Sequence, residues 1–244
     1  MAPAPRPDPN AGVFETLLVV AGRPVELDAH LARLAAGLEA LFEAELPREA
    51  GDLARERAAG IDIGRLRLTV APGSAGLEVD AGAVEVDPAL VFPSRERAVD
   101  LRCLLVEGGL GAHKWADRAL LERAEAADPR AVPLLVDGDG AVLEASRANV
   151  FAVRGDALHT PPADGRILPG IARAAAIEVA RERGIEVTEG RLTLADLRLA
   201  DEAFLTGSVR GVEPVDSVDG VALPPVAAEL SERIVAGLRR RWLG

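Results

Sequence analysis

One lysine stands out among the residues of this sequence that can do chemistry. Of the 28 residues that are Lys or Arg, 27 are Arg and only Lys114 is Lys. Arg replaces Lys wherever a positive charge is sufficient, but its guanidinium stays protonated and cannot serve as a neutral amine nucleophile. We therefore interpret Lys114 as a candidate amine for a Schiff base, with a surface lysine of no chemical role as the alternative.

An amine that holds an aldehyde cofactor needs two kinds of partner. One is an acid that keeps a ring nitrogen of the cofactor protonated, and the other is a cradle for a phosphate group. Glu144 is the candidate acid because it lies at the end of a predicted strand, where a buried carboxylate would make a charge-assisted hydrogen bond to such a nitrogen. The alternative is a solvent-facing position in a hairpin.

Three parts of the sequence are candidates for the phosphate cradle. Leu168-Pro169-Gly170-Ile171 precedes a predicted helix, whose first backbone N–H groups and dipole favour an anion. Thr206-Gly207-Ser208 is a turn of small residues after a predicted strand, and it offers a hydroxyl and backbone amides. Arg33 adds a positive charge. Taken singly, the first is more often an ordinary helix start and the second an ordinary turn, and Arg33 could equally be a solvated helix residue.

Alternating and helical hydrophobic patterns predict the elements that must position these residues. Strands are predicted at 13–20, 65–71, 76–86, 99–106, 132–136, 142–144, 149–153, 157–160, 185–188 and 202–206, with a hairpin over 211–223. Helices are predicted at 29–44 with Asp28 as its cap, at 48–59, from Lys114 to about 127, at 171–183 and at 194–197, and a last one starts at Pro224-Pro225.

The order of these elements predicts an α+β fold in two parts. Residues 1–10 are rich in Pro and Ala and are expected to be disordered. Residues 11–97 are expected to form a small N-terminal α/β lobe that ends in a linker with two prolines. Residues 98–244 are expected to form a larger, strand-rich C-terminal lobe with flanking helices, and this lobe would bind the cofactor.

Composition and charge exclude several classes of function. The 39 acidic and 28 basic residues give a net charge of −11, which argues against nucleic acid as a partner. No run approaches the roughly 20 apolar residues of a membrane-spanning helix, and the start lacks the apolar core of a secretory signal. The single cysteine, Cys103, excludes an internal disulfide and a cysteine-based zinc site. A cytoplasmic protein without a metal site, acting on a small molecule, is the default expectation.

The candidate residues occur within an ordered set of motifs that resembles one known family. The set resembles the class IV aminotransferases, which are pyridoxal-phosphate enzymes of fold type IV. The matching segments are Val13-Phe14-Glu15-Thr16, His30-Leu31-Ala32-Arg33-Leu34, Lys114, Leu143-Glu144-Ala145-Ser146 with Asn149-Val150-Phe151, Leu168-Pro169-Gly170-Ile171, and Phe204-Leu205-Thr206-Gly207-Ser208 with Pro214-Val215. They follow the order and spacing of the family over nearly the whole chain.

The resemblance implies roles for the candidate residues and a dimeric assembly. Lys114 would hold the cofactor covalently and then move a proton, and Glu144 would pair with the pyridine nitrogen. The phosphate would be held by Arg33, the backbone of Ile171 and Ala172, Ser208 and the backbone of Val209. Similar enzymes are homodimers in which a small and a large lobe enclose the cofactor.

The residues after Lys114 favour one branch of this family. Branched-chain aminotransferases have a tyrosine five residues after the lysine, whereas this chain has Ala119 there and no tyrosine at all. The stretch Lys114-Trp115-Ala116-Asp117-Arg118 looks more like the 4-amino-4-deoxychorismate lyases, which release pyruvate and leave p-aminobenzoate. An aminotransferase for branched-chain or D-amino acids remains an alternative, and so does a non-catalytic relative that acts as a partner subunit.

Several positions depart from the family pattern or stay open. The usual opening strand before Phe14 is absent, and Ala172 replaces a threonine, so that a hydroxyl is lost but a backbone amide is kept. Arg210 either binds a substrate carboxylate or points to solvent. His113 either modulates the pKa of Lys114 or packs, and Trp115 and Cys103 are interpreted as packing residues.

Overall fold

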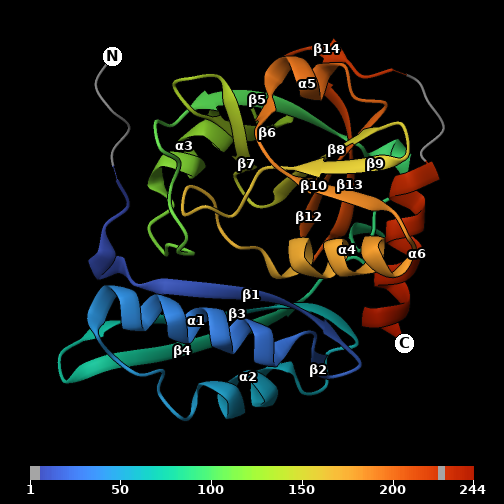
Figure 1. Ribbon diagram of the computed structural model, residues 1–244. Coiled ribbons are helices and arrows are strands. Elements are labelled where there is room, and N and C mark those ends of the chain that lie inside the picture. The colour runs from blue at the N-terminus through green and yellow to red at the C-terminus, as the bar shows by residue number, and fades with distance from the viewer. Residues whose placement is uncertain (1–5, 225–228) are drawn as a thin grey trace.

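Two β-sheets with helices packed against them build the chain (Figure 1). The structure, a computed structural model, describes residues 6–224 and 229–244. The combination of sheets and helices confirms the α+β class expected from the sequence. One sheet belongs to an N-terminal lobe, coloured blue to teal in Figure 1, and the other to a C-terminal lobe, coloured green to red.

The N-terminal lobe is an antiparallel sheet with two helices on one face (Figure 1). Its elements are β1 (Val13–Val20), β2 (Arg23–Pro24), α1 (Leu27–Phe42), α2 (Ala50–Ala58), β3 (Ile63–Gly73) and β4 (Gly76–Glu85). The strand order is β2-β1-β3-β4. Strand β3 alternates as predicted: Leu66 and Leu68 are buried under the helices, whereas Arg65 and Arg67 are exposed on the opposite face.

The C-terminal lobe contains a larger, mixed sheet. Its elements are β5 (Val99–Leu105), α3 (Ala119–Ala127), β6 (Ala131–Val136), β7 (Ala141–Ala145), β8 (Asn149–Arg154), β9 (Ala157–Thr160), α4 (Ile171–Glu182), β10 (Glu186–Glu189), β11 (Leu192–Thr193), α5 (Leu194–Arg198), β12 (Glu202–Gly207), β13 (Gly211–Val218), β14 (Val221–Ala222) and α6 (Glu229–Leu243). The order is β10-β9-β8-β12-β13-β5-β6-β7-β11, and β14 pairs with β13. Within the described ranges, no helix is long and apolar enough to cross a lipid bilayer.

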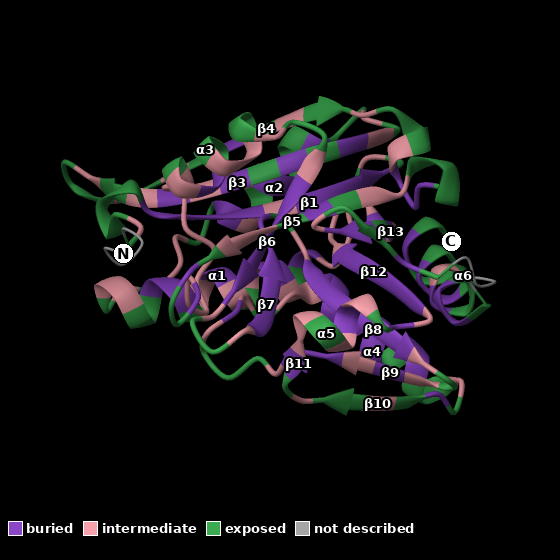
Figure 2. Ribbon diagram, turned by 90° about the horizontal axis from the view of Figure 1, so that it is seen from above, coloured by how far each residue is buried: buried purple, intermediate pink, exposed green. Residues whose placement is uncertain are grey.

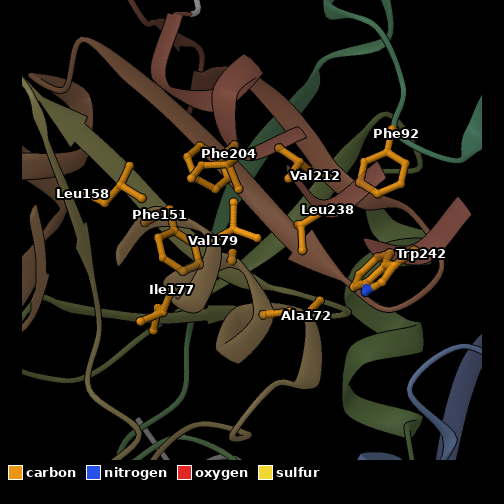
Figure 3. Close-up of a cluster of buried hydrophobic side chains, with 14 of the residues drawn as sticks. Phe92, Phe151, Leu158, Ala172, Ile177, Val179, Phe204, Val212, Leu238 and Trp242 are labelled. Carbon is orange, nitrogen blue, oxygen red and sulfur yellow. The ribbon is translucent and has the colours of Figure 1, made fainter. Parts of the chain in front are cut away.

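An apolar cluster fixes α4 and α6 against this sheet (Figure 3). The rings of Phe151 on β8 and Phe204 on β12 stack with their centroids 5.0 Å apart. Ala172 and Ala176 on α4 are small enough to let the helix approach these rings closely. The N-terminus of α4 is therefore held in a defined position relative to the end of β12.

Strand β1 is buried between the two lobes, as its mostly buried colouring in Figure 2 shows. Leu17 and Val19 pack with the helices of the N-terminal lobe. Leu18 and Val20, on the other face, join the apolar cluster of the C-terminal lobe. Because β1 has an apolar residue on both faces, it fixes the position of one lobe against the other.

The segment around Lys114 differs from the prediction. We expected Lys114 to open a helix, but this is wrong, because α3 begins only at Ala119. Gly109 and Gly111 have positive φ angles of 68° and 89° and turn the chain before the lysine. Asp117, just before the helix, accepts a hydrogen bond of 3.0 Å from the N–H of Ala119, and Arg118 is the N-cap residue.

The N-terminal segment also differs from the prediction. We expected residues 1–10 to be disordered, but Pro9–Ala11 forms a 3-10 turn for which Asp8 is the cap. The guanidinium of Arg6 donates a hydrogen bond of 2.7 Å to the carbonyl oxygen of Gly109. Composition misses this order because it arises from contacts with a distant part of the chain. Residues 1–5 lie outside the described residues.

One predicted helix start is wrong, and another falls partly outside the described residues. Asp28 does not cap α1, because the helix already begins at Leu27, after Glu26 in a left-handed conformation with φ 54°. Asp28 instead lies in the first turn, where its charge favours the helix dipole. The predicted start of the last helix includes Pro225, which lies outside the described residues, and α6 is described from Glu229.

Candidate active site

Lys114 lies on an extended segment that is hydrogen-bonded to the start of β1. The N–H of Phe14 donates to the carbonyl oxygen of Lys114 at 2.9 Å. Val13 and Trp115 form an antiparallel bridge beside it. The backbone of the lysine is therefore fixed by the N-terminal lobe, although the lysine follows β5 of the C-terminal lobe.

The lysine side chain is half-buried in an environment that favours its neutral form. Its Nζ lies 5.0 Å from the centroid of the Phe14 ring. Burial, and then the positive charge of Arg33, lower the pKa of Lys114 to about 8, although Glu15 and Glu144 oppose this shift. A nucleophile and proton carrier needs a pKa near the operating pH, and this is what the surroundings provide.

Glu144 lies at the end of β7 and is 8% exposed. Its Oε2 accepts a hydrogen bond of 3.2 Å from the backbone N–H of Leu168. Burial raises the pKa of Glu144 to about 8, against that hydrogen bond and the positive charge of Lys114. A protonated ring nitrogen beside this carboxyl group would stabilise its ionised form, because an opposite charge in a buried site lowers the pKa of an acid.

The other end of the same cleft is suited to an anion. Ile171 and Ala172 are the first residues of α4, and no side chain caps this helix end in the described structure, so its first N–H groups can bind a phosphate. The hydroxyl oxygen of Thr206 is buried and has no hydrogen-bond partner among the described residues. Buried hydroxyls are normally paired, so Thr206, together with Ser208 two residues further on, is suited to hydrogen-bond a phosphate oxygen.

Arg33 reaches this cleft from α1, but its guanidinium is already partly paired. Its Nε and Nη2 donate to the two carboxylate oxygens of Glu15 at 2.7 and 2.6 Å. Its Nη1 donates to the carbonyl oxygen of Pro169 at 3.0 Å. Arg33 therefore joins the N-terminal lobe to the loop that leads into α4, next to the expected phosphate position.

Glu15 holds Arg33 in place from the buried face of β1. His30 Nδ1 lies 2.7 Å from Oε2 of Glu15, and both side chains are 1% exposed. Burial alone would raise the pKa of Glu15, but the hydrogen bond with His30 and the charge of Arg33 outweigh it and lower the pKa to about 2. The carboxylate is therefore ionised at neutral pH and keeps the guanidinium oriented.

The predicted cofactor residues thus meet in one cleft between the lobes, which we call the inner cleft. The inner cleft is lined by Phe14, Arg33, Leu110, Lys114, Leu121, Leu135, Glu144, Asn149, Ile171, Ala172, Thr206, Gly207 and Ser208, among others. An adjoining outer cavity shares Lys114 and Ser208 with it. Val209, whose backbone is predicted to help hold the phosphate, lines the outer cavity next to Ser208.

The outer cavity is rich in arginine. Its charged lining residues are Arg65, Arg67, Lys114, Arg118, Arg147, Arg210 and Glu213. Glu213 is 2% exposed and is paired on both sides: it accepts hydrogen bonds from Arg210 at 2.9 Å and from Arg147 at 3.0 and 3.1 Å. Arg210, our candidate for a substrate carboxylate, therefore already has a carboxylate partner within the chain.

Three other arginines, Arg65, Arg67 and Arg118, form what we call the basic wall of the outer cavity. The guanidinium of Arg67 lies 3.9 Å from the centroid of the Phe14 ring. Partial burial, and then the positive charges of Arg118 and Arg65, lower the pKa of Arg67. Neither Arg65 nor Arg67 has an ion pair among the described residues, so this wall presents positive charge that favours an anion.

His113 and Trp115 pack against each other rather than against the reactive groups. Their ring centroids lie 5.3 Å apart in an edge-to-face arrangement, and Trp115 Nε1 donates to the carbonyl oxygen of Leu110 at 2.8 Å. The charged groups that act on the pKa of Lys114 do not include His113. Of the two alternatives for His113, the structure favours packing.

Sequence reasoning missed the basic wall and the supports of the phosphate loop. Arg65 and Arg67 alternate on a strand, and this spacing is a usable signal for two charges on one face. Asn149 Nδ2 donates to the carbonyl oxygen of Leu168 at 3.0 Å. A Cβ at Gly170 would collide with the side-chain oxygen of Asn149, so this close approach requires glycine.

The residues of the inner cleft fit pyridoxal phosphate. An amine, a buried acid and an anion-binding helix start lie along one cleft, and the unpartnered hydroxyl of Thr206 offers a donor to a phosphate. This combination defines an enzyme that works through a cofactor of this kind. The chain belongs to the class IV aminotransferase family, whose family model matches residues 12–218.

Relatives with assigned names cover most of the chain. The bifunctional aminodeoxychorismate lyase / D-amino acid transaminase of Mycobacterium tuberculosis strain H37Rv is 34% identical over 259 residues, which cover 93% of this chain and 89% of that protein. The aminodeoxychorismate lyase of Bacillus subtilis strain 168 is 29% identical over 229 residues, which cover 86% of this chain and 78% of that protein.

A solved structure shares both the fold and part of the sequence. The pyridoxal-phosphate-bound form of a hypothetical aminotransferase from Mycobacterium tuberculosis superimposes with a TM-score of 0.80 at 26% identity, over 97% of this chain and 94% of that one. Branched-chain-amino-acid aminotransferases match at 43% to 46% identity, but over only 28% to 30% of their own length. The shared part is therefore only a segment of those proteins.

Proposed function

We propose that this chain is a pyridoxal-phosphate-dependent 4-amino-4-deoxychorismate lyase, which gives p-aminobenzoate and pyruvate. The observation that carries the proposal is the basic wall of Arg65, Arg67 and Arg118 beside Lys114. The substrate of such a lyase has two carboxylates, and arginine binds carboxylates with charge-assisted hydrogen bonds. An apolar branched side chain would instead leave Arg65 and Arg67 without a carboxylate partner, whereas Arg118 is already paired with Glu125.

Two further observations support the lyase. Relatives named as aminodeoxychorismate lyases align over 86% and 93% of this chain, whereas the segments shared with branched-chain aminotransferases are short. The first residue of α3 is Ala119, at the position five residues after Lys114 where those aminotransferases have a tyrosine.

The residues that would hold the cofactor lie at the two ends of the inner cleft. The N–H groups of Ile171 and Ala172, with Thr206 and Ser208, would bind the phosphate, and Arg33 would add its charge beside them. Glu144 would pair with the pyridine nitrogen at the buried end. When bound, pyridoxal phosphate supplies an aldehyde for an amine and a ring that withdraws electrons.

Lys114 would then work as the proton carrier of the reaction. As a neutral amine it accepts the proton from the substrate carbon that bears the amino group. The carbon–oxygen bond to the enol side chain breaks, the side chain leaves as pyruvate after taking up a proton, and the six-membered ring becomes aromatic. The basic wall would hold the carboxylates and so orient the carbon toward Nζ of Lys114.

A second candidate function is transamination at the same site. It is favoured by the relative whose name combines a lyase with a D-amino acid transaminase and which is 34% identical over 93% of this chain. Both reactions would use Lys114, Glu144 and the phosphate cradle in the same way. They differ in whether Lys114 returns the proton to the cofactor or the substrate loses pyruvate.

The proposal is tested with the purified chain in two steps. The first is a visible spectrum with added pyridoxal phosphate, followed by borohydride reduction and mapping of the labelled peptide, which is expected to contain Lys114. The second is pyruvate release from 4-amino-4-deoxychorismate, read by coupling to lactate dehydrogenase. A colourless, unlabelled protein contradicts the cofactor, and a labelled protein that transaminates amino acids without releasing pyruvate contradicts the lyase.

The proposed enzyme is a cytoplasmic homodimer, as the composition and the resemblance predict. Size-exclusion chromatography with light scattering measures the assembly directly. A mass near twice the 25.5 kDa of the chain supports the dimer, and a mass near that of one chain contradicts it.

A further inference from the structure

The N-terminal segment, residues 6–8, runs beside the loop that carries the reactive lysine (Figure 1). Arg6 donates a hydrogen bond of 2.7 Å from Nη1 to the carbonyl oxygen of Gly109. The N–H of Asp8 donates a hydrogen bond of 2.9 Å to Oδ2 of Asp117. The segment is therefore attached on both sides of its central residue.

That central residue, Pro7, reaches the inner cleft. Pro7 is half-buried, whereas Arg6 and Asp8 on either side of it are exposed. It forms part of the wall of the inner cleft together with Leu110 and Leu121. Proline has a restricted backbone, so ordering such a segment costs less conformational entropy than ordering most others.

The part of the cleft that Pro7 borders is the end that contains Glu144. Leu121 and Leu135 belong to one apolar cluster with Leu143, which immediately precedes Glu144. Pro7, Leu121, Leu135 and Glu144 all line the inner cleft. Arg6 and Pro7 also line a small neighbouring cavity with Leu110, Leu121 and Arg118. The N-terminal segment therefore lies beside the apolar surroundings of the buried acid, with Arg118 as the member of the basic wall nearest to it.

We infer that residues 6–8 form the outer wall of the Glu144 end of the inner cleft and slow the release of bound cofactor. This inference rests on the proposed pyridoxal-phosphate dependence. Excluding water strengthens a charge-assisted hydrogen bond in a buried site, so a closed wall keeps the carboxyl of Glu144 and a ring nitrogen paired. Without the segment, water would enter beside Leu121 and compete for that pair.

The test compares two truncations of the full chain. The first lacks residues 2–8, and the matched control lacks residues 2–5 and so keeps Arg6, Pro7 and Asp8. Arg6→Ala breaks one attachment without shortening the chain, and Arg6→Lys keeps a charged donor at that position. Each protein is loaded with pyridoxal phosphate, and release is followed by visible absorbance after transfer into an excess of a competing apo-enzyme.

The full chain and its variants are expected to differ in how fast they release the cofactor. The truncation of residues 2–8 is expected to release the cofactor at least fivefold faster than the full chain. Arg6→Ala is expected to fall between them, Arg6→Lys to restore most of the slow release, and the truncation of residues 2–5 to match the full chain. Equal release rates from the full chain, Arg6→Ala and the truncation of residues 2–8 would overturn the inference.

A second measurement needs no cofactor and separates this inference from the proposed function. In a Trp242→Phe background Trp115 is the remaining one of the two tryptophans, and it lines the inner cleft. Acrylamide quenching of cofactor-free protein is expected to rise when residues 2–8 are removed and to stay unchanged when residues 2–5 are removed. If the full chain binds no cofactor, the proposed function fails. If removal of residues 2–8 leaves the quenching of Trp115 unchanged, residues 6–8 do not form a wall of the inner cleft.

Discussion

The two sides of Lys114 differ in burial, in charge and in the origin of their residues. On one side lies Glu144, an acid that is 8% exposed and is bordered by an apolar cluster around Leu121 and Leu143. On the other side lies the basic wall, in which Arg65 and Arg67 are exposed and lack an ion pair among the described residues.

This difference separates the residues that would carry out the reaction from the residues that would bind the substrate. Glu144 and most of the phosphate cradle come from the C-terminal lobe, with Arg33 of α1 as the contribution of the N-terminal lobe, and together they provide the groups that any reaction of this cofactor needs. The basic wall comes largely from β3 of the N-terminal lobe, where no residue has to contact the cofactor. The N-terminal lobe can therefore set the substrate while the C-terminal lobe keeps the chemistry.

The largest expected effect comes from the residue that both sides share. Lys114→Arg is expected to lower activity by at least about 1000-fold, because it removes both the nucleophilic amine and the proton carrier. The measurement is the rate of pyruvate release, together with borohydride labelling. Since this variant contains no lysine, it is expected to show no pyridoxyl-lysine peptide.

A matched variant tests whether a lysine elsewhere in the chain can replace Lys114. Arg57→Lys, on the exposed side of α2, places a lysine far from the inner cleft in the Lys114→Arg background. It is expected to restore neither activity nor a cofactor spectrum. Full activity in either protein would show that the proton is carried by another group.

The next largest effect is expected at the acid side. Glu144→Gln is expected to lower activity by about 10- to 100-fold, since a hydrogen bond to a charged group contributes about 1.5–3 kcal/mol. Gln keeps the shape and a hydrogen-bonding oxygen but cannot carry the negative charge. The matched control is Glu85→Gln, at the exposed end of β4, for which no change in activity is expected.

The same variant has a consequence for stability in the absence of cofactor. Burial raises the pKa of Glu144 from 4.5 to about 8. Between these values the unfolded chain has lost the proton while the folded chain keeps it, so stability falls as the pH rises, by at most about 1.4 kcal/mol per pH unit. Urea unfolding from pH 5 to 8 is expected to show a smaller decrease for Glu144→Gln; identical slopes contradict a protonated, buried Glu144.

Much of the fold could be predicted because local patterns and tertiary packing agree. The alternation of RLRLTVA predicts β3, and the structure places Leu66 and Leu68 inside with Arg65 and Arg67 outside. The start of α3 could not be predicted in this way. The residues after Lys114 have helical spacing, but the lysine backbone pairs with β1, which is distant in the sequence, so the helix begins only at Ala119.

For the candidate site too, some residues could be predicted from local sequence and others could not. Lys114, Glu144 and the start of α4 were found because each leaves a signal in its own segment, namely a rare residue type or a motif. The pairing of Arg33 with Glu15, and of Arg210 with Glu213, was missed because side-chain partners depend on how strands and helices meet. For the same reason the sequence did not show which of its 27 arginines remain unpaired beside the lysine.

The smallest expected effect tests this last distinction and sharpens the contrast between paired and unpaired arginines. Arg67→Gln is expected to raise the KM for the dicarboxylate substrate about five- to tenfold, because it removes a partly solvated charged contact. Arg210→Gln is expected to change KM less, since Glu213 already neutralises Arg210 within the chain. Steady-state kinetics at several salt concentrations measure both, with the exposed Arg57→Gln as the control. For Arg67→Gln, kcat is expected to fall by less than KM rises, because Arg67 would act on a carboxylate of the substrate and orient the reacting carbon only indirectly. A larger KM effect from Arg210→Gln than from Arg67→Gln would mean that the Arg210–Glu213 pair opens on binding and that the carboxylate lies at the other edge of the outer cavity.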